Sequence, residues 1–418
     1  MTRQLAISVR RDHTLIGLFE DQKLVDLFLD RPDQESAVGN IYVGRVVRVL
    51  NNIQAAFIDI GLPKDGFLAG DDALPYPHAP AKARHGALGD MIKTGQIIPV
   101  QVEKDEISDK GKKLTMDLSI PGRYLVYFPY QKHKINISKR VEDRKERKRL
   151  RDLLTEVKGS DQGAWIVRTV AEGATKKDLQ YDARNLLSVW KETAARIEKA
   201  AEPILIHREL TPIEQVLRDH YSDDFDRILI DNLRAKQHID RFIRSLQPKR
   251  LIPRRVTEYM EPDELLTTFG FKKELERAMS RKVWLDCGGY LIIEETETLT
   301  AIDVNTGKNV KGGSGMEAIT RTNLEAAEEI GRQIRLRGIG GIIVVDFIDM
   351  KSSKDIQKVV SNLHRSLSKD KTAFDITPFS EIGLVQITRK RTGESLITLL
   401  SEDCPHCNGN GRILTLRG

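Results

Sequence analysis

Two cysteines close to the C-terminus, Cys404 and Cys407, have the CxxC spacing of half a structural zinc site. A tetrahedral zinc ion takes four ligands, so two more are needed. They could be His406, a distant residue such as Cys287 or His364, or the same CxxC pair of a second copy of the chain. The last arrangement would make the metal an assembly device and predicts a homodimer. Without a metal, the segment is a C-terminal turn with two free thiols.

A second group of chemically capable residues lies at the ends of two apolar segments. Residues 299–305 end on Asp303 and Asn305, and residues 340–349 carry Asp346 after a run of isoleucine and valine. An uninterrupted apolar run is typical of a central strand that is buried on both faces. Side chains at the carboxyl ends of such strands line the site crevice of an α/β sheet. We therefore expect the two carboxylates to meet.

Two carboxylates, completed by water and a substrate phosphate, are a ligand set that suits Mg²⁺. Such a cation polarises a phosphoryl oxygen and lowers the pKa of a bound water, so that hydroxide can attack in line. Asn305 points to the same side as Asp303 and could donate to the scissile phosphate, which would stabilise developing charge. The alternative is that the strand-end acids only cap nearby helices.

A loop over 307–313 and a helix from about 317 to 337 separate the two apolar segments. Glycines and lysines in the loop favour phosphate contacts. The helical arginines that we expect to remain available to phosphate are Arg321, Arg332 and Arg335.

Short strands separated by turn residues occupy the region from Gly39 to Leu68, a pattern typical of a small antiparallel barrel. Alternation of period two turns Phe57 away from the barrel core, and Phe67 follows Gly66 on a later strand. Lysines come soon after, namely Lys110, Lys112 and Lys113. Aromatic rings beside cations suit base stacking and phosphate pairing, so single-stranded nucleic acid is the expected ligand. The alternative is that Phe67, or Phe57, belongs to the core.

Further along, a strand over 165–170 runs into a glycine-containing turn, and a long amphipathic helix over 179–201 follows. Arg168 and Thr169, at the end of that strand, could donate together to the oxygens of a terminal phosphate. The basic run over 139–151 is either a solvated helix face or an RNA contact.

The chain of 418 residues is long enough for about three domains. It has three cysteines, no apolar run long enough to span a bilayer and no signal-peptide pattern. These features predict a reducing compartment, with the cytoplasm as the default. The formal net charge is +6, and the positive residues are clustered, which favours a nucleic-acid partner over a merely solvated basic surface.

Five motifs, in one order along the chain, resemble those of the ribonuclease E/G family. They are 300–305 (TAIDVN), 322–327 (TNLEAA), 344–350 (VVDFIDM), 388–391 (TRKR) and 404–407 (CPHC). The chain looks closer to the ribonuclease G branch, because of the Arg-Lys-Arg run and the lack of a long disordered tail. The resemblance covers nearly the whole chain.

The resemblance implies a Mg²⁺-dependent endoribonuclease that cuts single-stranded, AU-rich RNA to leave 5′-phosphate and 3′-hydroxyl ends, in mRNA decay and rRNA processing. By similarity, Asp303 and Asp346 would bind Mg²⁺ and Asn305 would orient the scissile phosphate. Cys404 and Cys407 would share one Zn²⁺ with a second protomer, giving a homodimer. The partners would be messenger RNA and ribosomal RNA precursors, with no membrane span.

The family also implies two further RNA contacts. Residues that would guide RNA on an S1 domain are Phe57, Phe67, Lys110 and Lys112. Residues that match a pocket for a 5′-monophosphate are Gly122, Val126, Arg168 and Thr169.

The implied fold class is a multidomain α/β protein. A ribonuclease H-like domain is interrupted by two inserted domains and is followed by a catalytic domain. The expected domains are 1–35 (ribonuclease H-like, first part), 36–118 (S1, an OB fold), 119–208 (5′-sensor), 209–280 (ribonuclease H-like, second part), 281–400 (deoxyribonuclease I-like, catalytic) and 401–418 (zinc-link).

Two departures from the family pattern affect these expectations. Ala373 stands where members that sense the 5′ end strongly carry an additional arginine, which predicts weakened selectivity for monophosphorylated ends. The sequence ends at Gly418, whereas family members continue into a small domain that pairs dimers, so a dimer is the expected assembly. Two other functions stay open: a non-catalytic S1-type RNA-binding or ribosome-assembly factor, and a metallophosphoesterase acting on small nucleotides.

Overall fold

The structure is a computed structural model that describes residues 2–31, 36–74, 88–106, 111–132, 134–159, 161, 163–221, 225–246, 257–268, 270–307, 315–380, 383–391, 393–407, 409 and 411. The chain divides into two compact units. Unit 1 comprises Met1–Leu29, Asp224–Lys236 and Arg255–Gly418, and unit 2 comprises Asp30–Asp223 and Gln237–Arg254. Both combine helices with sheets, which confirms the mixed α/β class. Within the described ranges, no helix is long and apolar enough to cross a membrane.

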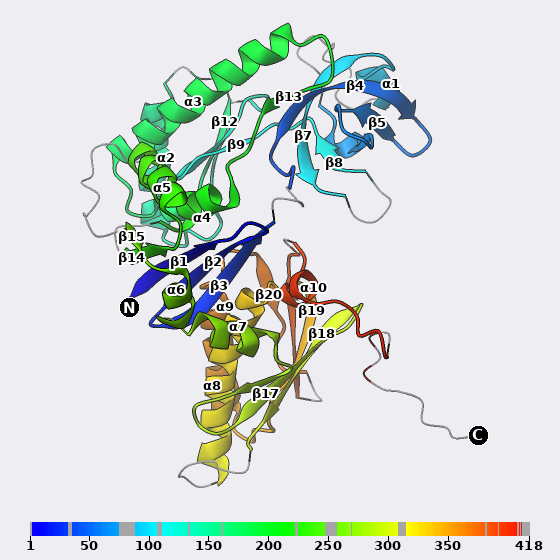
Figure 1. Ribbon diagram of the computed structural model, residues 1–418. Helices are drawn as coiled ribbons and strands as arrows, with labels where there is room; N and C mark the ends of the chain where they lie inside the picture. Colours follow the sequence, from blue (N-terminus) through cyan, green and yellow to red (C-terminus); the bar gives the residue numbers. More distant parts are fainter. Residues whose placement is uncertain are drawn as a thin grey trace. The chain divides into compact units, whose positions relative to one another are not determined.

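The first sheet of unit 1 joins strands from distant parts of the sequence (Figure 1). Its order is β15 (Thr257–Tyr259), β14 (Phe225–Ile230), β1 (Arg3–Val9), β2 (Thr14–Glu20) and β3 (Lys23–Asp30). β1 pairs with β2 antiparallel and with β14 parallel. In the turn between β2 and β3, Asp21 and Gln22 both have positive φ. Two short helices, α6 (Pro262–Thr268) and α7 (Phe271–Met279), contribute to the same core.

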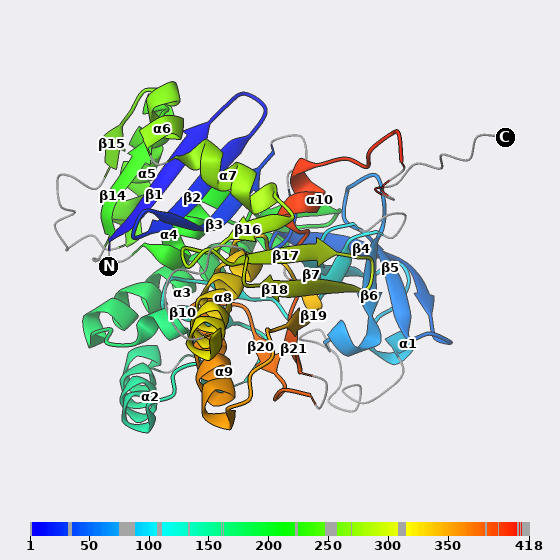
Figure 2. The same ribbon diagram turned by 90° about the horizontal axis from the view of Figure 1, so that it is seen from below.

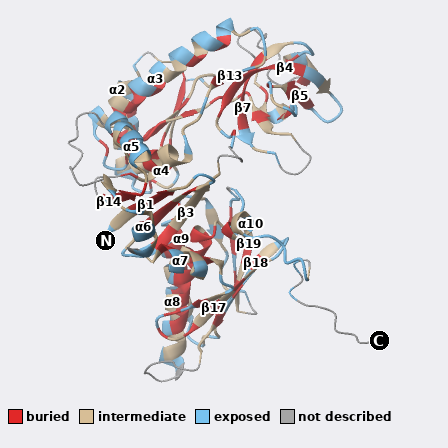
Figure 3. Ribbon diagram, in the orientation of Figure 1, coloured by how far each residue is buried: buried red, intermediate tan, exposed pale blue. Residues whose placement is uncertain are grey.

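The second sheet of unit 1 carries the two acidic segments. Its order is β16 (Lys282–Trp284), β17 (Tyr290–Glu295), β18 (Leu299–Asn305), β19 (Gly341–Asp346), β21 (Leu384–Arg389) and β20 (Phe374–Ile376). The remaining helices are α8 (Gly315–Leu336), α9 (Ser353–Leu367) and α10 (Leu396–Leu400). α8 and α9 pack against one face of this sheet, and their apolar side chains share a core with the strands (Figures 1 and 3).

Only one face of the six-stranded sheet is covered by those helices. Along β19, Ile343 and Val345 are fully buried, whereas Ile342 is 45% exposed. The prediction that this strand is buried on both faces is therefore wrong. The apolar run could not reveal it, because a run of isoleucine and valine has the same composition whether one or both faces are covered. The face away from α8 and α9 is open, and Figure 2 shows β16, β17 and β18 side by side.

Unit 2 contains the predicted barrel. Its strands are β4 (Ile41–Leu50), β5 (Ala55–Asp59), β6 (Gly66–Ala69), β7 (Ile97–Lys104) and β8 (Lys113–Thr115), with β13 (Ile204–His207) added beside β4. Pairing of β4 with β7 closes the ring. The barrel is not antiparallel throughout, since β6 and β8 pair parallel. The short helices of this region are η2 (Gly70–Asp72) and α1 (Leu88–Met91).

A second, four-stranded sheet of unit 2 has the order β11 (Ile135–Ile137), β12 (Ala164–Val167), β10 (Leu125–Phe128) and β9 (Ile120–Pro121). The helices are α2 (Arg144–Lys158), η4 (Thr169–Ala171), α3 (Lys176–Lys199) and α4 (Pro212–His220), and α5 (Leu233–Leu246) spans the sequence boundary at Lys236. The predicted long helix is confirmed as α3, where a capping box between Thr175 and Asp178 fixes the start. Much of the basic run lies on α2.

Candidate active site

Asp303 and Asp346 lie directly beside each other on the parallel strands β18 and β19. Both are exposed, on the face of the sheet that the helices leave open. Asn305 is two residues beyond Asp303, so its side chain is on the same face. Its Nδ2 donates to Asp303 Oδ2 at 2.8 Å. The structure thus brings together the three residues that the sequence singled out.

The electrostatics of this pair favour a bound cation. The pKa of Asp346 is raised, first by partial burial and then by the negative charges of Asp303 and Asp349. A divalent ion would relieve that repulsion. In the described ranges, no group of three or more His, Cys, Asp or Glu side chains is arranged to hold a metal. Two carboxylates, with water and phosphate oxygens completing the shell, still fit Mg²⁺, which is seldom held by an all-protein cage.

Two polar residues of α8 fix the loops that flank the site. Asn323 is fully buried, its Nδ2 donates to the Ile348 carbonyl oxygen at 2.7 Å, and its Oδ1 accepts from the Ile348 amide at 3.1 Å. Glu325 accepts from the amides of Asp286 and Cys287. These bonds give positioning roles to two residues of the TNLEAA motif. The sequence marked the motif without indicating what its side chains contact.

The prediction that α8 supplies arginines to phosphate is wrong for two of the three. Arg332 pairs with Glu329 at 2.6 Å and with Glu274 at 3.0 Å. Arg335 pairs with Asp26, and both arginine side chains are only 9% exposed. They tie α8 to neighbouring parts of unit 1. Arg321 is exposed.

On the barrel of unit 2, Phe57 and Phe67 are cross-strand neighbours on β5 and β6. Their rings meet edge to face at a centroid distance of 6.1 Å, and Arg48 lies over the Phe57 ring at 5.7 Å. Both phenylalanines are half-buried and lie outside the barrel core cluster. The two aromatic side chains are therefore together on the outer surface of the barrel.

The lysines expected to accompany these rings are less available. Lys112 Nζ lies 3.3 Å from Asp105 and 3.7 Å from Glu106. Lys113 Nζ is paired with Asp72 and Glu103. Phosphate would have to compete with these carboxylates. Lys110 lies outside the described residues.

The residues matching a 5′-phosphate pocket lie in or next to the strands of the second sheet of unit 2. Arg168 Nη1 donates to the Gly122 carbonyl oxygen at 2.7 Å and to Asp219 Oδ1 at 2.6 Å. Thr169 Oγ1 is 2.9 Å from Ser138 Oγ. Val126 lies on β10, opposite the strand that leads into Arg168. The structure brings Gly122 and Arg168 into contact, with Thr169 adjacent in sequence.

Asp182 explains why glycine is needed at position 122. Its carboxylate accepts from the amides of Tyr124 and Leu125 at 2.8 and 2.9 Å. A Cβ on Gly122 would lie 2.7 Å from that carboxylate, so any larger residue would displace it. The glycine allows the close approach that orders the turn before β10.

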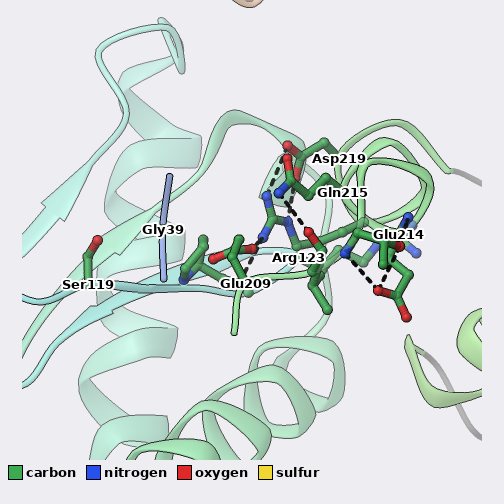
Figure 4. A network of polar contacts seen from close by, with 12 residues as sticks. Gly39, Ser119, Arg123, Glu209, Glu214, Gln215 and Asp219 are labelled. Atoms are coloured by element: carbon green, nitrogen blue, oxygen red, sulfur yellow. Dashed lines mark hydrogen bonds and ion pairs between the residues drawn. The ribbon is translucent and has the colours of Figure 1, made fainter. Parts of the chain in front are cut away.

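The sequence did not identify the partner of Arg168. Asp219 is near the end of α4, and its Oδ1 also accepts from Arg218 Nε at 2.8 Å. Arg218 in turn pairs with Glu209 at 2.7 Å, and Figure 4 shows Asp219 and Glu209 in this network. Burial would raise the pKa of Asp219, but hydrogen bonds and charges from Arg218 and Arg168 outweigh it and lower the pKa.

The CxxC segment forms a turn, with the Cys407 amide donating to the Cys404 carbonyl oxygen at 3.2 Å. Cys404 is exposed, and amides of His406 and Cys407 lower the pKa of its thiol. Cys287 is a buried core residue, and the ring of His364 packs against Phe374. In the described part of the chain, neither joins a metal-holding group with the CxxC pair.

The comparisons with known proteins agree on one family. The family model described as "Ribonuclease E/G family" matches residues 119–392. Ribonuclease G of Escherichia coli (strain K12) is 37% identical over 421 residues, which cover 100% of this chain and 85% of that protein. Ribonuclease G of Haemophilus influenzae is 35% identical, with 99% and 84% covered. Ribonuclease E of Nostoc sp. is 35% identical over 100% of this chain and 60% of its own length.

Proposed function

The chain belongs to the ribonuclease E/G family and is an endoribonuclease, and from this premise we propose that it cuts single-stranded RNA with Mg²⁺ held by Asp303 and Asp346. The observation that carries the proposal is the pairing of these two aspartates on adjacent strands, on the open face of the sheet. The products would carry 5′-phosphate and 3′-hydroxyl ends.

Each of the three residues has a separate task in this proposal. When bound, Mg²⁺ supplies Lewis-acid polarisation of the phosphoryl oxygen and an activated water. Asp303 and Asp346 hold it. Asp303 also accepts from one N–H of Asn305 and thereby orients the amide. This hydrogen bond also sets the direction of the second N–H of Asn305. That N–H can donate to a non-bridging oxygen of the scissile phosphate, where charge develops.

We propose that the barrel of unit 2 is an S1 domain that guides the RNA. Phe57 and Phe67 would stack on bases, and Lys112 would meet phosphate in exchange for its contacts with Asp105 and Glu106. Lys110 would also guide RNA on this domain, as the family resemblance implies. The aromatic pair, half-buried on the outer surface of the barrel, supports this part of the proposal, because stacking needs ring faces outside a core.

We further propose that Gly122, Val126, Arg168 and Thr169 bind a 5′-monophosphate. A guanidinium has five N–H donors, and the bonds to Gly122 and Asp219 use Nη1. The preference should be weak, since Ala373 offers no second guanidinium.

The zinc proposal is that Cys404 and Cys407 share one Zn²⁺ with the same pair of a second chain. The exposed Cys404, whose thiol pKa is lowered, supports it, because thiolate is the form that binds metal. The remaining proposals rest on the family resemblance: AU-rich substrates, a role in mRNA decay and rRNA processing in the cytoplasm, and the domain boundaries 1–35, 36–118, 119–208, 209–280, 281–400 and 401–418.

The deciding experiment is cleavage of one unstructured AU-rich oligoribonucleotide, bearing either a 5′-monophosphate or a 5′-hydroxyl, with Mg²⁺ and with chelator. We expect internal cuts that need Mg²⁺ and that are lost in the Asp303→Asn, Asp346→Asn double variant. Full activity of that variant would refute the site. Tight binding with intact RNA in every lane would favour a non-catalytic RNA-binding factor, and cleavage of mononucleotides alone would favour a small-molecule phosphoesterase.

A further inference from the structure

An aromatic pair that belongs to none of the core clusters of the described residues lies at the edge of the six-stranded sheet of unit 1. Trp284 on β16 and Tyr290 on β17 are cross-strand partners, with ring centroids 5.3 Å apart. Trp284 is 56% exposed. Its backbone is anchored, because Arg277 Nη2 donates to the Trp284 carbonyl oxygen at 2.7 Å and the Leu285 amide donates to the Gly289 carbonyl oxygen across the hairpin.

A lysine completes this group. Lys282 Nζ lies 3.7 Å from the Tyr290 ring centroid and 4.0 Å from the Trp284 ring centroid. Among the described residues, no carboxylate forms an ion pair with Lys282, in contrast to Lys112 and Lys113 of unit 2. The rings hold the ammonium group in place and leave its charge without an anionic partner.

Strand register places the aromatic pair beside the proposed catalytic residues. Tyr290 is directly opposite Asn305 on β18, so Trp284, Tyr290 and Asn305 form one row on the open face. The next row runs from Lys282 through Ile292 to Asp303 and Asp346. With neighbouring strands about 4.8 Å apart, Trp284 is roughly 10 Å from Asn305.

We propose that Trp284 and Tyr290 form a stacking subsite for one base of the RNA, next to the scissile phosphate, and that Lys282 pairs with the phosphate of that nucleotide. This inference rests on the proposed function of Asp303 and Asp346, because it assumes that the scissile phosphate lies there. Every base has a π-face, so the subsite tolerates any sequence and fixes the register of the strand relative to the metal.

The charge of the group favours RNA over a protein partner. Lys282 lies beside two rings at the edge of the proposed phosphodiester site. The rings complement the base of a nucleotide, and the ammonium group complements its phosphate. An apolar protein surface would leave Lys282 desolvated and without a partner. Cross-strand aromatic pairs also stabilise hairpins, so the test must separate folding from binding.

The first experiment measures binding of a fluorescent, unstructured oligoribonucleotide by anisotropy, in chelator so that the RNA stays intact. Loss of one base-stacking contact is worth about 1–3 kcal/mol, so Trp284→Ala should weaken binding by about 5- to 150-fold. Trp284→Phe keeps an aromatic face and should bind nearly as the wild type does. Thermal unfolding of each variant checks the fold.

The second experiment locates the base. Bases of the oligoribonucleotide are replaced one at a time by abasic ribose, and each substrate is tested on wild type and Trp284→Ala. An abasic ribose at one position next to the cut should weaken binding to the wild type and should have no further effect on binding to Trp284→Ala. Independent, additive losses at every position would overturn the subsite.

Lys282→Gln tests the phosphate contact. Losing one phosphate contact to a single strand should make the slope of log K against log salt shallower by about 0.7. Lys272→Gln, at an exposed lysine on α7, is the matched control and should leave the slope unchanged. An unchanged slope for Lys282→Gln would remove the lysine from the proposal.

The outcomes separate this inference from the function on which it rests. In Mg²⁺, Trp284→Ala should raise KM and leave kcat unchanged, because stacking stabilises ground and transition states alike. If Trp284→Ala binds and cuts like the wild type while the Asp303→Asn, Asp346→Asn variant is inactive, only the subsite is refuted. If Trp284→Ala lowers the assembly state in sedimentation without affecting RNA, a second copy of the chain covers this face, and the subsite is again refuted.

Discussion

Arg168 and Asp219 form an ion pair with an Nη1–Oδ1 distance of 2.6 Å, although 51 positions separate them in the sequence. The same Nη1 donates to the Gly122 carbonyl oxygen. Both side chains remain about a quarter exposed, at 23% and 24%. The guanidinium that we assign to 5′-phosphate recognition is thus held in place before any ligand arrives, by a carboxylate on α4.

We expect Arg168→Gln to remove the preference for 5′-monophosphorylated RNA. Glutamine lacks the charge and the fork of donors that suit a phosphate. The ratio of cleavage rates on monophosphate and hydroxyl substrates should fall to one, while the rate on the hydroxyl substrate stays unchanged. Arg149→Gln, at an arginine of the same unit that pairs with Glu146, should keep the ratio. An unaltered ratio in Arg168→Gln would show that the phosphate is sensed elsewhere.

Asp219→Asn should lower stability at neutral pH and lose that effect in acid. Because the folded-state pKa of Asp219 is lowered, its contribution is fully present above the unfolded-state value, about 3.9, and is lost as the pH falls through the lower folded value. We expect a loss of about 2 kcal/mol in the free energy of unfolding, typical of a charged hydrogen bond that is partly exposed.

Denaturant unfolding of the wild type and Asp219→Asn, from pH 7 to pH 3, measures this difference. The two curves should be parallel down to about pH 5 and begin to converge below about pH 4. A difference that persists unchanged in acid would mean that the asparagine disturbs packing instead of removing a charge.

The proposed catalytic residues Asp303, Asn305 and Asp346 could be found from the sequence because they end two recognisable strands. Asp303 and Asn305 share a face by alternation, and the parallel partner strand delivers Asp346 to the same row. The alternation along each strand and the parallel pairing of the two strands were together sufficient to predict that these side chains meet. The same reasoning failed for the covering of β19, since nothing in an apolar run tells whether helices pack on one face or on both.

Long-range ion pairs were the other feature that the sequence could not reveal. Arg332 and Arg335 look like free cations on a helix, and their partners Glu274 and Asp26 come from segments about 60 and 300 positions away. Pairing across such distances depends on tertiary packing, which no period in the sequence encodes. The carboxylates that pair with Lys112, Asp105 and Glu106, are by contrast close to it in the sequence.

Asn305→Ala should lower kcat by about 10²–10³, the usual cost of removing one donor aimed at developing charge. RNA affinity should change little, because the contact strengthens only in the transition state. Single-turnover cleavage in Mg²⁺ measures the rate. Gln386→Ala removes another exposed amide from the same face of the sheet, on β21, and should retain full activity. Equal losses in the two variants would argue against a specific role for Asn305.

Phe57→Ala and Phe67→Ala should each weaken RNA binding by about 5- to 150-fold if the rings stack on bases. Because the rings contact each other, the double variant should lose less than the sum of the single losses. Anisotropy with an unstructured oligoribonucleotide gives the affinities. Ile53→Ala, at an exposed apolar residue of the same barrel, is the control and should bind normally.

Cys404→Ser and Cys407→Ser should lower the assembly state while leaving each protomer folded. The CxxC turn lies apart from the hydrophobic cores of the described residues, so its loss removes only the metal contact. Sedimentation and zinc analysis should give a dimer with one zinc per two chains for the wild type, and zinc-free chains of lower mass for the variants. Cys287→Ala, at a buried thiol, should keep both zinc and dimer. A wild-type dimer that contains no zinc, or one that survives Cys404→Ser unchanged, would place the dimer contact in another part of the chain.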